Sequence, residues 1–293
     1  MLRLIGSVTV LALLMVGCAG GGGGSSSPLP PPPPVTYTAG GAVSGLVGLG
    51  LELEICTLGS RGDVCDHHQQ ISVNGAFDLG GAYPAVYSGP DWVSVLQQPS
   101  SPTQRCVVGN ATITIRHAND TSVTVSCVEY SYVTNAADNT LSSYSVDATT
   151  GALTVIGTPT DTGASPHAVV GFQEKLAHED KRFVFVGNEG SNDVSAFAVN
   201  NTTGALTAVP GSPFAAGTDP QGMALSGSRL YVANAGSNNV SAYDIDVNTG
   251  ALTGTSTSAS GKNPTSIVIN SYRNIYVANH GGSNDISAFF IDQ

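Results

Sequence analysis

The chain has 293 residues, of which 36 are glycine and only 11% are charged, and its formal net charge is −11 at pH 7. A typical soluble domain carries about 25% charged residues and about 7% glycine, so this composition argues against a helix-rich enzyme. The acidic balance lacks the basic surface that phosphate groups require, which excludes nucleic acid as an expected partner.

The first 18 residues have the pattern of an export signal. Arg3 precedes an apolar run, residues 4–16, that is too short to span about 30 Å of hydrocarbon as a permanent helix. Residues Met15-Val16-Gly17-Cys18 resemble the lipobox of bacterial lipoproteins, with Met15 where leucine is usual. The resemblance implies that Cys18 is acylated and begins the mature chain. An ordinary signal peptide followed by a chance cysteine is the alternative.

Residues 19–34 are expected to be a tether. Glycines and serines fill residues 20–27, and prolines fill residues 30–34. The first part is a flexible linker and the second is a stiff spacer, and neither can pack as a domain. We therefore expect a lipid-anchored protein in a bacterial cell envelope, facing the periplasm or exposed on the outer membrane.

Four further cysteines predict two disulfide bonds. An even number in an exported chain favours disulfides over metal ligation, and the sequence contains no CxxC pair. We expect neither a metal nor a cofactor. Local pairing, Cys56 with Cys65 and Cys106 with Cys127, is the natural arrangement, and the sequence leaves all three connectivities open.

Residues 35–128 alternate apolar and polar side chains in short runs, for example in residues 51–55 and 122–128. This period of two predicts half-buried strands, and about 95 such residues favour a β-sandwich. Asn74-Gly75 predicts a hairpin turn. Asp66-His67-His68 carries possible metal-ligand types, but neighbours on a strand point to opposite faces, so a solvated loop is the better interpretation.

Parts of this segment resemble a sandwich module of bacterial surface proteins. The resemblance rests on Ser-Val-Asn-Gly-Ala-Phe at residues 72–77, on Gln97-Gln98-Pro99, on Cys106 and on the closing run to Cys127. In that module the two late cysteines pair, which implies a bond between Cys106 and Cys127. Cys56 and Cys65 would then form an additional clip.

Residues 129–293 contain an internal repeat. A Tyr-Val-x-Asn motif or its close variant ends at Asn135, Asn188, Asn234 and Asn279. Each copy is followed by Ser-x-Tyr/Phe, and Thr-Gly-Ala-Leu-Thr occurs three times. A further strand is expected after each of Pro166, Pro220 and Pro264. Four short strands in about 45 residues are typical of a β-propeller blade.

The repeats hold three, four, four and three strands, which is about 3.5 blades. Incomplete blades expose unpaired backbone groups, which favours self-association through the open edges. Three alternatives remain open for the missing part: a truncated or partial chain, a seven-bladed ring closed by two copies, and an open or small closed ring.

The motifs of residues 130–293 resemble the YVTN and lactonase-type seven-bladed β-propeller family. The resemblance rests on Tyr-Val-Ala-Asn-x-Gly-Ser-Asn-x-Val-Ser-Ala-Tyr and on Thr-Gly-Ala-Leu-Thr. The family includes 6-phosphogluconolactonase, cycloisomerases of muconolactone-type substrates and envelope proteins without an assigned activity. It implies that the loops after the second and fourth strands of each blade gather at one mouth, where the enzymes place a histidine, arginines and a glutamate.

His167 is the catalytic candidate that the resemblance implies, because Pro166-His167 matches the family's Pro-His at the start of a blade. Gln221 stands where the next blade's arginine is expected, and an amide cannot supply that fixed positive charge. Glu189 lies one blade earlier than the matching glutamate, and the later loop has Ala235. This incomplete set favours binding over catalysis.

The sequence therefore predicts an all-β lipoprotein, with an N-terminal β-sandwich in residues 35–128 and a partial propeller of four-stranded blades in residues 129–293. The propeller is expected to be a binding or scaffolding platform for a protein, peptide or glycan. The expected mouth residues are Asn135, Asn188, Asn234, Asn279 and Gln221. A lactonase-like hydrolase that uses His167 and Glu189 is the alternative.

Overall fold

The computed structural model describes residues 36–59, 62–80, 83–84, 91–100, 104–113, 119–175, 180–282 and 285–291. All regular elements in these ranges are strands, so the fold is all-β as predicted. Among the described residues there is no helix with the length and apolarity that crossing a membrane requires. The predicted signal, Cys18 and the tether lie outside the described residues.

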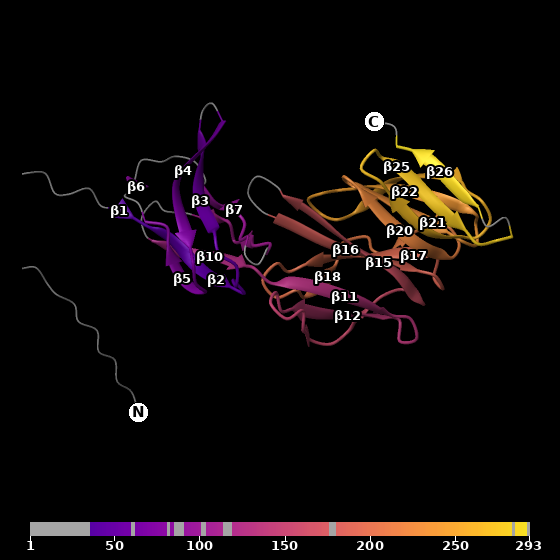
Figure 1. The fold of residues 1–293 in the computed structure, drawn as a ribbon, viewed down its shortest axis with the longest axis horizontal. Coiled ribbons are helices and arrows are strands. Elements are labelled where there is room, and N and C mark those ends of the chain that lie inside the picture. Colours follow the sequence, from indigo (N-terminus) through magenta and orange to yellow (C-terminus); the bar gives the residue numbers. More distant parts are fainter. Residues whose placement is uncertain are drawn as a thin grey trace, which may run out of the picture. The chain divides into compact units, whose positions relative to one another are not determined.

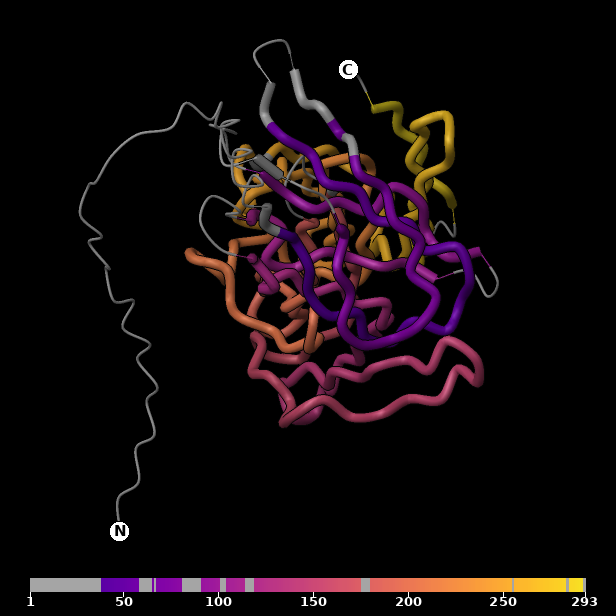
Figure 2. The backbone as a smooth tube through the Cα atoms, turned by 90° about the vertical axis from the view of Figure 1, so that its left-hand side faces the viewer, coloured from indigo at the N-terminus to yellow at the C-terminus, as the bar shows by residue number. Residues whose placement is uncertain are grey.

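Two four-stranded sheets form the first part of the chain, indigo to purple in Figures 1 and 2. The first has the order β5-β2-β10-β8 and contains β2 (Ala39–Ser44), β5 (Gly75–Asp78), β8 (Val107–Gly109) and β10 (Asp120–Ser126). The second has the order β4-β3-β7-β9 and contains β3 (Leu51–Gly59), β4 (Gly62–Ile71), β7 (Asp91–Gln97) and β9 (Thr112–Ile113). A short sheet pairs β1 (Thr36–Tyr37) with β6 (Tyr83–Pro84).

The two four-stranded sheets share one apolar core, which confirms the predicted sandwich. Leu51, Leu53 and Ile55 are fully buried on β3, and the glutamates between them are partly exposed. They belong to the same cluster as Val43 and Val125 of the other sheet. The period of two in the sequence thus identified the buried face of this strand correctly.

The predicted hairpin at Asn74-Gly75 is wrong. The strand before it, β4, pairs with β3, whereas the strand after it, β5, pairs with β2 in the other sheet. The turn therefore carries the chain from one sheet to the other. The Asn74 amide bonds to Leu46, accepting from its N–H at 2.7 Å and donating to its carbonyl at 2.8 Å. The loop expected at Asp66-His67-His68 is also wrong, because these residues lie within β4.

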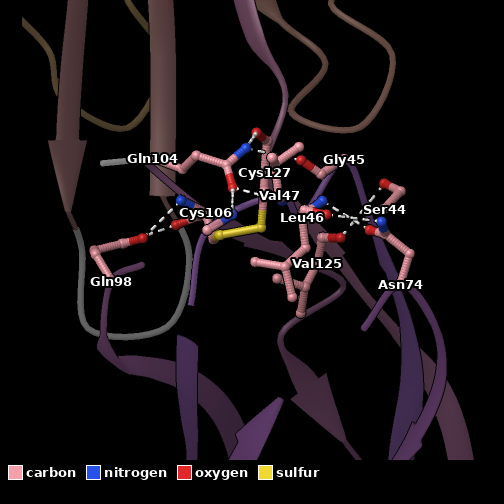
Figure 3. The surroundings of a disulfide bond; sticks show 11 residues. Ser44, Gly45, Leu46, Val47, Asn74, Gln98, Gln104, Cys106, Val125 and Cys127 are labelled. Atoms are coloured by element: carbon pink, nitrogen blue, oxygen red, sulfur yellow. Dashed lines mark hydrogen bonds between the residues drawn. A yellow bond between two sulfur atoms is a disulfide. The ribbon is translucent and has the colours of Figure 1, made fainter. Parts of the chain in front are cut away.

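Both local disulfides are present, Cys56–Cys65 and Cys106–Cys127. The second is shown with its surroundings in Figure 3. The Gln98 side chain accepts a hydrogen bond from the Cys106 N–H at 2.6 Å and donates to the Cys106 carbonyl at 2.9 Å. The amide thereby pairs with the backbone of Cys106 as a neighbouring strand would.

Gln104 is a buried polar side chain beside this disulfide. Its Oε1 accepts from the N–H groups of Val47 at 2.7 Å and Gly48 at 2.6 Å. Its Nε2 donates to the carbonyls of Gly45 at 2.8 Å and Cys127 at 3.2 Å. Since each amide atom has two partners, the side chain is fully satisfied. It ties the loop that follows β2 to the second disulfide (Figure 3).

Four more sheets follow, which we call blades 1 to 4 (Figure 1). Blade 1 contains β11 (Glu129–Asn135), β12 (Thr140–Val146), β13 (Leu153–Val155) and β14 (Thr160–Asp161). Blade 2 contains β15 (Pro166–Lys175), β16 (Asp180–Asn188), β17 (Asp193–Val199), β18 (Leu206–Ala208) and β19 (Phe214–Ala215). Blade 3 contains β20 (Pro220–Ser226), β21 (Arg229–Asn234), β22 (Asn239–Ile245) and β23 (Leu252–Ala259). Blade 4 contains β24 (Pro264–Ile269), β25 (Asn274–Asn279) and β26 (Ile286–Phe290).

The repeat predicted these blades correctly, and their strands pair in chain order. Only the last strand of blades 1 to 3, which begins at the leucine of Thr-Gly-Ala-Leu-Thr, differs from the expectation. In blades 1 and 2 it is split into two short pieces, β13 with β14 and β18 with β19, which pair with the same neighbour. In blade 3 it is the continuous strand β23, with one register shift.

The first and last blades each leave one face uncovered. Tyr231 and Val240 of blade 3 are 6% and 4% exposed and pack in one cluster with blade 4. Their equivalents on blade 4, Tyr276 and Ile286, are 38% and 69% exposed. On the opposite face of blade 1, Val133 is 43% exposed. The described blades therefore form an open series with apolar side chains at both ends.

Candidate functional site

A β-bulge recurs at the start of the first strand in blades 2, 3 and 4. Register shifts directly after the leading prolines make His167, Gln221 and Thr265 the extra residues. A bulge re-aims the side chain of its extra residue and frequently lies beside a functional site. Because β15, β20 and β24 are neighbours, these three residues form a series along one end of the blades, which we call the bulge row.

His167 is exposed and held in place by the next blade. Its Nδ1 lies 3.0 Å from the backbone carbonyl of Gln221. A carbonyl only accepts, so this contact assigns a proton to Nδ1 and leaves the lone pair of Nε2 free in the neutral ring. The sequence predicted the residue but not this orientation, which depends on a residue 54 positions away.

Glu189 and Gln221 lie at the same end of the blades as His167. The Glu189 N–H donates to the Ser165 carbonyl at 3.0 Å, which places the glutamate beside the strand entry that carries His167. The Gln221 Nε2 donates to Asp219 Oδ1 at 3.2 Å. These contacts, which use backbone atoms of Glu189 and Gln221, place the three residues at one end of the blades. Together they offer an imidazole, a carboxylate and a neutral amide.

The four asparagines expected to line the mouth are bonded within their own blades. Asn188 and Asn234 are fully buried, and Asn279 is 4% exposed. The Asn188 Nδ2 donates to Asp193 Oδ1 at 2.6 Å and to Ser195 Oγ at 2.9 Å. Equivalent bonds to the following strand are made by Asn135, Asn234 and Asn279. Ligand binding by the four residues stays a prediction, and the burial of Asn188, Asn234 and Asn279 favours a structural role.

A second asparagine in each loop joins one blade to the next. The Oδ1 atoms of Asn139, Asn192 and Asn238 accept from the N–H groups of Ser165, Asp219 and Asn263, each at 2.8 Å. Each acceptor belongs to one blade, and each donor immediately precedes the proline of the following blade. We call these bonds the blade joints.

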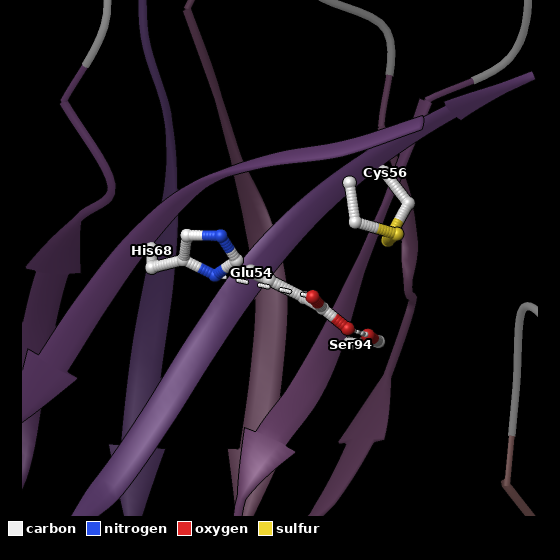
Figure 4. A network of polar contacts seen from close by, with 5 residues as sticks. Glu54, Cys56, His68 and Ser94 are labelled. Atoms are coloured by element: carbon white, nitrogen blue, oxygen red, sulfur yellow. Dashed lines mark hydrogen bonds and ion pairs between the residues drawn. A yellow bond between two sulfur atoms is a disulfide. The ribbon is translucent and has the colours of Figure 1, made fainter. Parts of the chain in front are cut away.

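Glu54, Ser94 and His68 form another polar cluster, in the sandwich (Figure 4). Ser94 Oγ donates to Glu54 Oε1 at 2.6 Å, and His68 Nδ1 lies 3.9 Å from Glu54 Oε2. The sulfurs of Cys56 and Cys65 lie close enough to Glu54 to share a metal ion with it. Since both are oxidised to a disulfide, they offer no thiolate ligand.

A comparison with models of protein families shows which family the chain belongs to. The model described as "Lactonase, 7-bladed beta-propeller" matches residues 116–269, more than half of the chain. The chain belongs to this family. The matched lactonase residues include blades 1 to 3 and the first strand of blade 4. His167, Glu189, Gln221 and Thr265 all fall within the match.

Solved structures similar to this lactonase-family chain include three proteins named for lactonase activity. A proposed 6-phosphogluconolactonase of Bacteroides uniformis is 17% identical with a TM-score of 0.48, covering 56% of this chain and 48% of that protein. A proposed 6-phosphogluconolactonase of Bacteroides fragilis is 15% identical with a TM-score of 0.42, covering 83% of this chain and 91% of that protein. The periplasmic gluconolactonase of Pseudomonas aeruginosa is 23% identical with a TM-score of 0.37, covering 46% of this chain and 38% of that protein.

The match to the Bacteroides uniformis protein spans about half of that protein's length, 48%. None of the curated proteins matches the chain.

Proposed function

We propose that this lactonase-family chain is a binding platform and that its ligand is contacted at the bulge row. The observation that carries the proposal is the repeated bulge, which presents His167, Gln221 and Thr265 from three neighbouring blades. An amide and a hydroxyl both donate and accept hydrogen bonds without carrying charge. This chemistry fits a neutral, polyhydroxylated ligand such as a glycan.

Binding to an array of neutral and acidic oligosaccharides tests this proposal. We expect a neutral glycan to bind, and Gln221→Ala to weaken its binding by about tenfold through a lost hydrogen bond. Gln70→Ala, an exposed amide on β4 of the sandwich, is the matched control and should bind as the parent chain does. Equal binding by both variants, or binding of acidic glycans alone, would contradict the proposal.

We further propose that the chain is anchored in a bacterial envelope through lipid on Cys18. The support is the sequence Met15-Val16-Gly17-Cys18, followed by the Gly/Ser/Pro tether. In a bacterial host, the full chain should incorporate a clickable palmitate analogue and fractionate with membranes. Cys18→Ser should lose the label and the membrane association. Unchanged labelling of this variant would refute lipidation at Cys18.

A lactonase-like hydrolase is the second proposed function, and one specific observation favours it. The Nε2 of His167 is free, and Glu189 lies at the same end of the blade. A histidine in this state can take a proton from water that attacks a lactone carbonyl. Hydrolysis of 6-phosphogluconolactone should fall to the uncatalysed rate in His167→Ala. Equal rates for the parent and this variant would end this candidate without affecting the glycan proposal.

Self-association is proposed through the two uncovered faces. In the interior of the series, the face that carries Tyr231 and Val240 is covered by the opposite face of the following blade. Blade 4 presents the equivalent Tyr276 and Ile286, and blade 1 presents the opposite face. Two copies joined in this way would contribute eight blade sheets, four from each chain. The count of about 3.5 blades per chain had suggested a ring of seven.

Sedimentation of the tether-free protein tests the association. Ile286→Asp should convert an oligomer into a monomer, because it places a charge on the proposed contact. Tyr272→Asp is the matched control, since Tyr272 is 78% exposed in the turn between β24 and β25. A monomeric parent chain would refute self-association.

A further inference from the structure

A hollow lies between blades 1 and 2, toward the end of the strands opposite the bulge row. Its volume is about 350 Å³, and it is lined by residues of β11, β15, β16 and β17. Gly171 on β15 is one cause of the space, because a Cβ added there would meet no atom within 4 Å. The equivalent residues of the next two blades, Leu225 and Ile269, pack into the apolar clusters between blades.

Arg182 brings unused hydrogen-bond donors into this hollow. The residue is only 9% exposed, and its Nε and Nη2 are buried without a hydrogen-bond partner. These two nitrogens form one edge of the guanidinium, and their N–H bonds point in parallel. A carboxylate accepts two parallel bonds from this edge in the side-on bidentate arrangement.

Gln173 adds a third donor from the neighbouring strand. It pairs in register with Arg182, lines the same hollow, and its buried Nε2 also has no hydrogen-bond partner. Buried donors in proteins are normally paired, since an unpaired buried donor loses its hydrogen bonds to water without gaining a partner. Two neighbouring side chains with free donors therefore indicate an acceptor that belongs between them.

The lining of the hollow carries one positive side chain, Arg182, and one negative side chain, Glu129, and its other residues are neutral. Burial lowers the pKa of Arg182, while the nearby Glu129 acts in the opposite direction. The Tyr130 and Tyr132 hydroxyls donate to the carbonyls of Asn201 at 3.3 Å and Gly204 at 3.1 Å. Burial raises the pKa of both tyrosines, so they stay neutral. Their rings are left to contact the ligand.

We propose that this hollow binds a small organic acid with an apolar body, its carboxylate held side-on by Arg182 and contacted by Gln173. The site is separate from the bulge row and does not depend on the function proposed there. Glu129 lines the same hollow and opposes an anion, so it limits the affinity.

Calorimetric titration of the full chain with benzoate, and with benzamide as the uncharged isostere, tests the proposal. We expect benzoate to bind at least about tenfold more tightly than benzamide, because only the carboxylate can use the Arg182 edge. Arg182→Met should weaken benzoate binding by about tenfold or more, and Glu129→Gln should strengthen it by several-fold. Arg229→Met, which removes an exposed arginine paired with Asp244, is the control and should leave binding unchanged.

Gly171→Leu keeps the test decisive if Arg182→Met fails to fold. It gives blade 2 the residue that blade 3 has at the same position, and its side chain would occupy the hollow. We expect this variant to stay folded and to lose benzoate binding. The proposal is overturned if benzoate and benzamide bind equally or not at all to the parent chain, or if folded Gly171→Leu binds benzoate like the parent.

Discussion

The sandwich and the blades are both sheets of short strands, but different interactions hold them together. All four cysteines after Cys18 lie in the sandwich, where they form two disulfides. These bonds and the contacts of the buried Gln104 amide are individual features that do not repeat along the chain. The blades contain no cysteine and use the same asparagine bonds in successive repeats. A non-repeating fold is thus stabilised by a few individual contacts, whereas the repeating fold distributes its stability over many equivalent ones.

Replacing Gln104 should have the largest effect and should be confined to the sandwich. Gln104→Leu leaves four backbone partners without the amide, and we expect a loss of about 4 kcal/mol of unfolding free energy. Native-state hydrogen exchange should accelerate on β2, β8 and β10 and stay unchanged in blade 3. Exchange that rises equally in both parts would show that they unfold as one unit.

Removing the second disulfide should be the next largest effect. The bond closes a loop with a sequence separation of 21 residues, so Cys106→Ala with Cys127→Ala should cost about 3 kcal/mol in the sandwich. Thermal unfolding followed with and without reductant measures this loss. Reductant should lower the stability of the parent chain by about 3 kcal/mol more than that of the double variant, which retains only Cys56–Cys65. An equal loss in the two chains would contradict this prediction.

A single added methyl group tests the blades. A Cβ on Gly217 would lie 2.5 Å from Ser237 Oγ and 2.6 Å from the side chain of Asn234, so Gly217→Ala should cost about 2 kcal/mol. The matched control is Gly171→Ala, whose Cβ meets open space. Chemical denaturation of both variants provides the comparison. An equal loss in the two variants would mean that the buried asparagine does not require glycine beside it.

Acidification should produce the smallest effect. Asp147 Oδ1 accepts from the N–H groups of Thr150 at 2.8 Å and Thr149 at 3.0 Å, which lowers the pKa of Asp147. Asp246 has a lowered pKa for the same reason, through the N–H groups of Asn248 and Thr249. The folded pKa therefore lies below the unfolded one, so these turns are stabilised above about pH 4 and lose this stabilisation as the pH falls through the folded values.

The equivalent residue of blade 2 is Asn200, which makes the same backbone bonds but cannot titrate. Amide exchange near residues 147 and 246 should therefore increase at low pH, while exchange near residue 200 should not. Asp147→Asn should remove the response from blade 1 alone. An equal acid response in all three turns would assign the effect to other groups.

The sequence predicted the strands and their order better than it predicted the side-chain contacts. The regular spacing of Asn188, Asn234 and Asn279 was sufficient to predict the strands of each blade, because each blade repeats the same local pattern. Asn74-Gly75 was misinterpreted, since the choice between a hairpin and a change of sheet depends on the distant Leu46. Gln104 was missed because its partners are up to 59 residues away.

The sequence predicted one residue of the candidate site but not the contacts that surround it. His167 was found because Pro166-His167 matches the Pro-His of the family that the repeats resemble. The bulge was not found because it depends on the register between β15 and β16. The contact to Gln221 and the hollow beside Arg182 were not found because they depend on how one blade packs on another. Arg182 in particular has no motif around it, and its free donors become visible only through burial.

The blade joints also bear on how such a chain can grow. Each joint takes its acceptor from one period and its donor from the next, as between Asn192 and Asp219. A DNA segment one period long, copied in tandem, therefore encodes a donor for the unit before it and an acceptor for the unit after it, wherever the copy begins. Duplication or deletion of whole periods leaves every remaining junction closed, so the number of blades can change during evolution without a new contact having to arise.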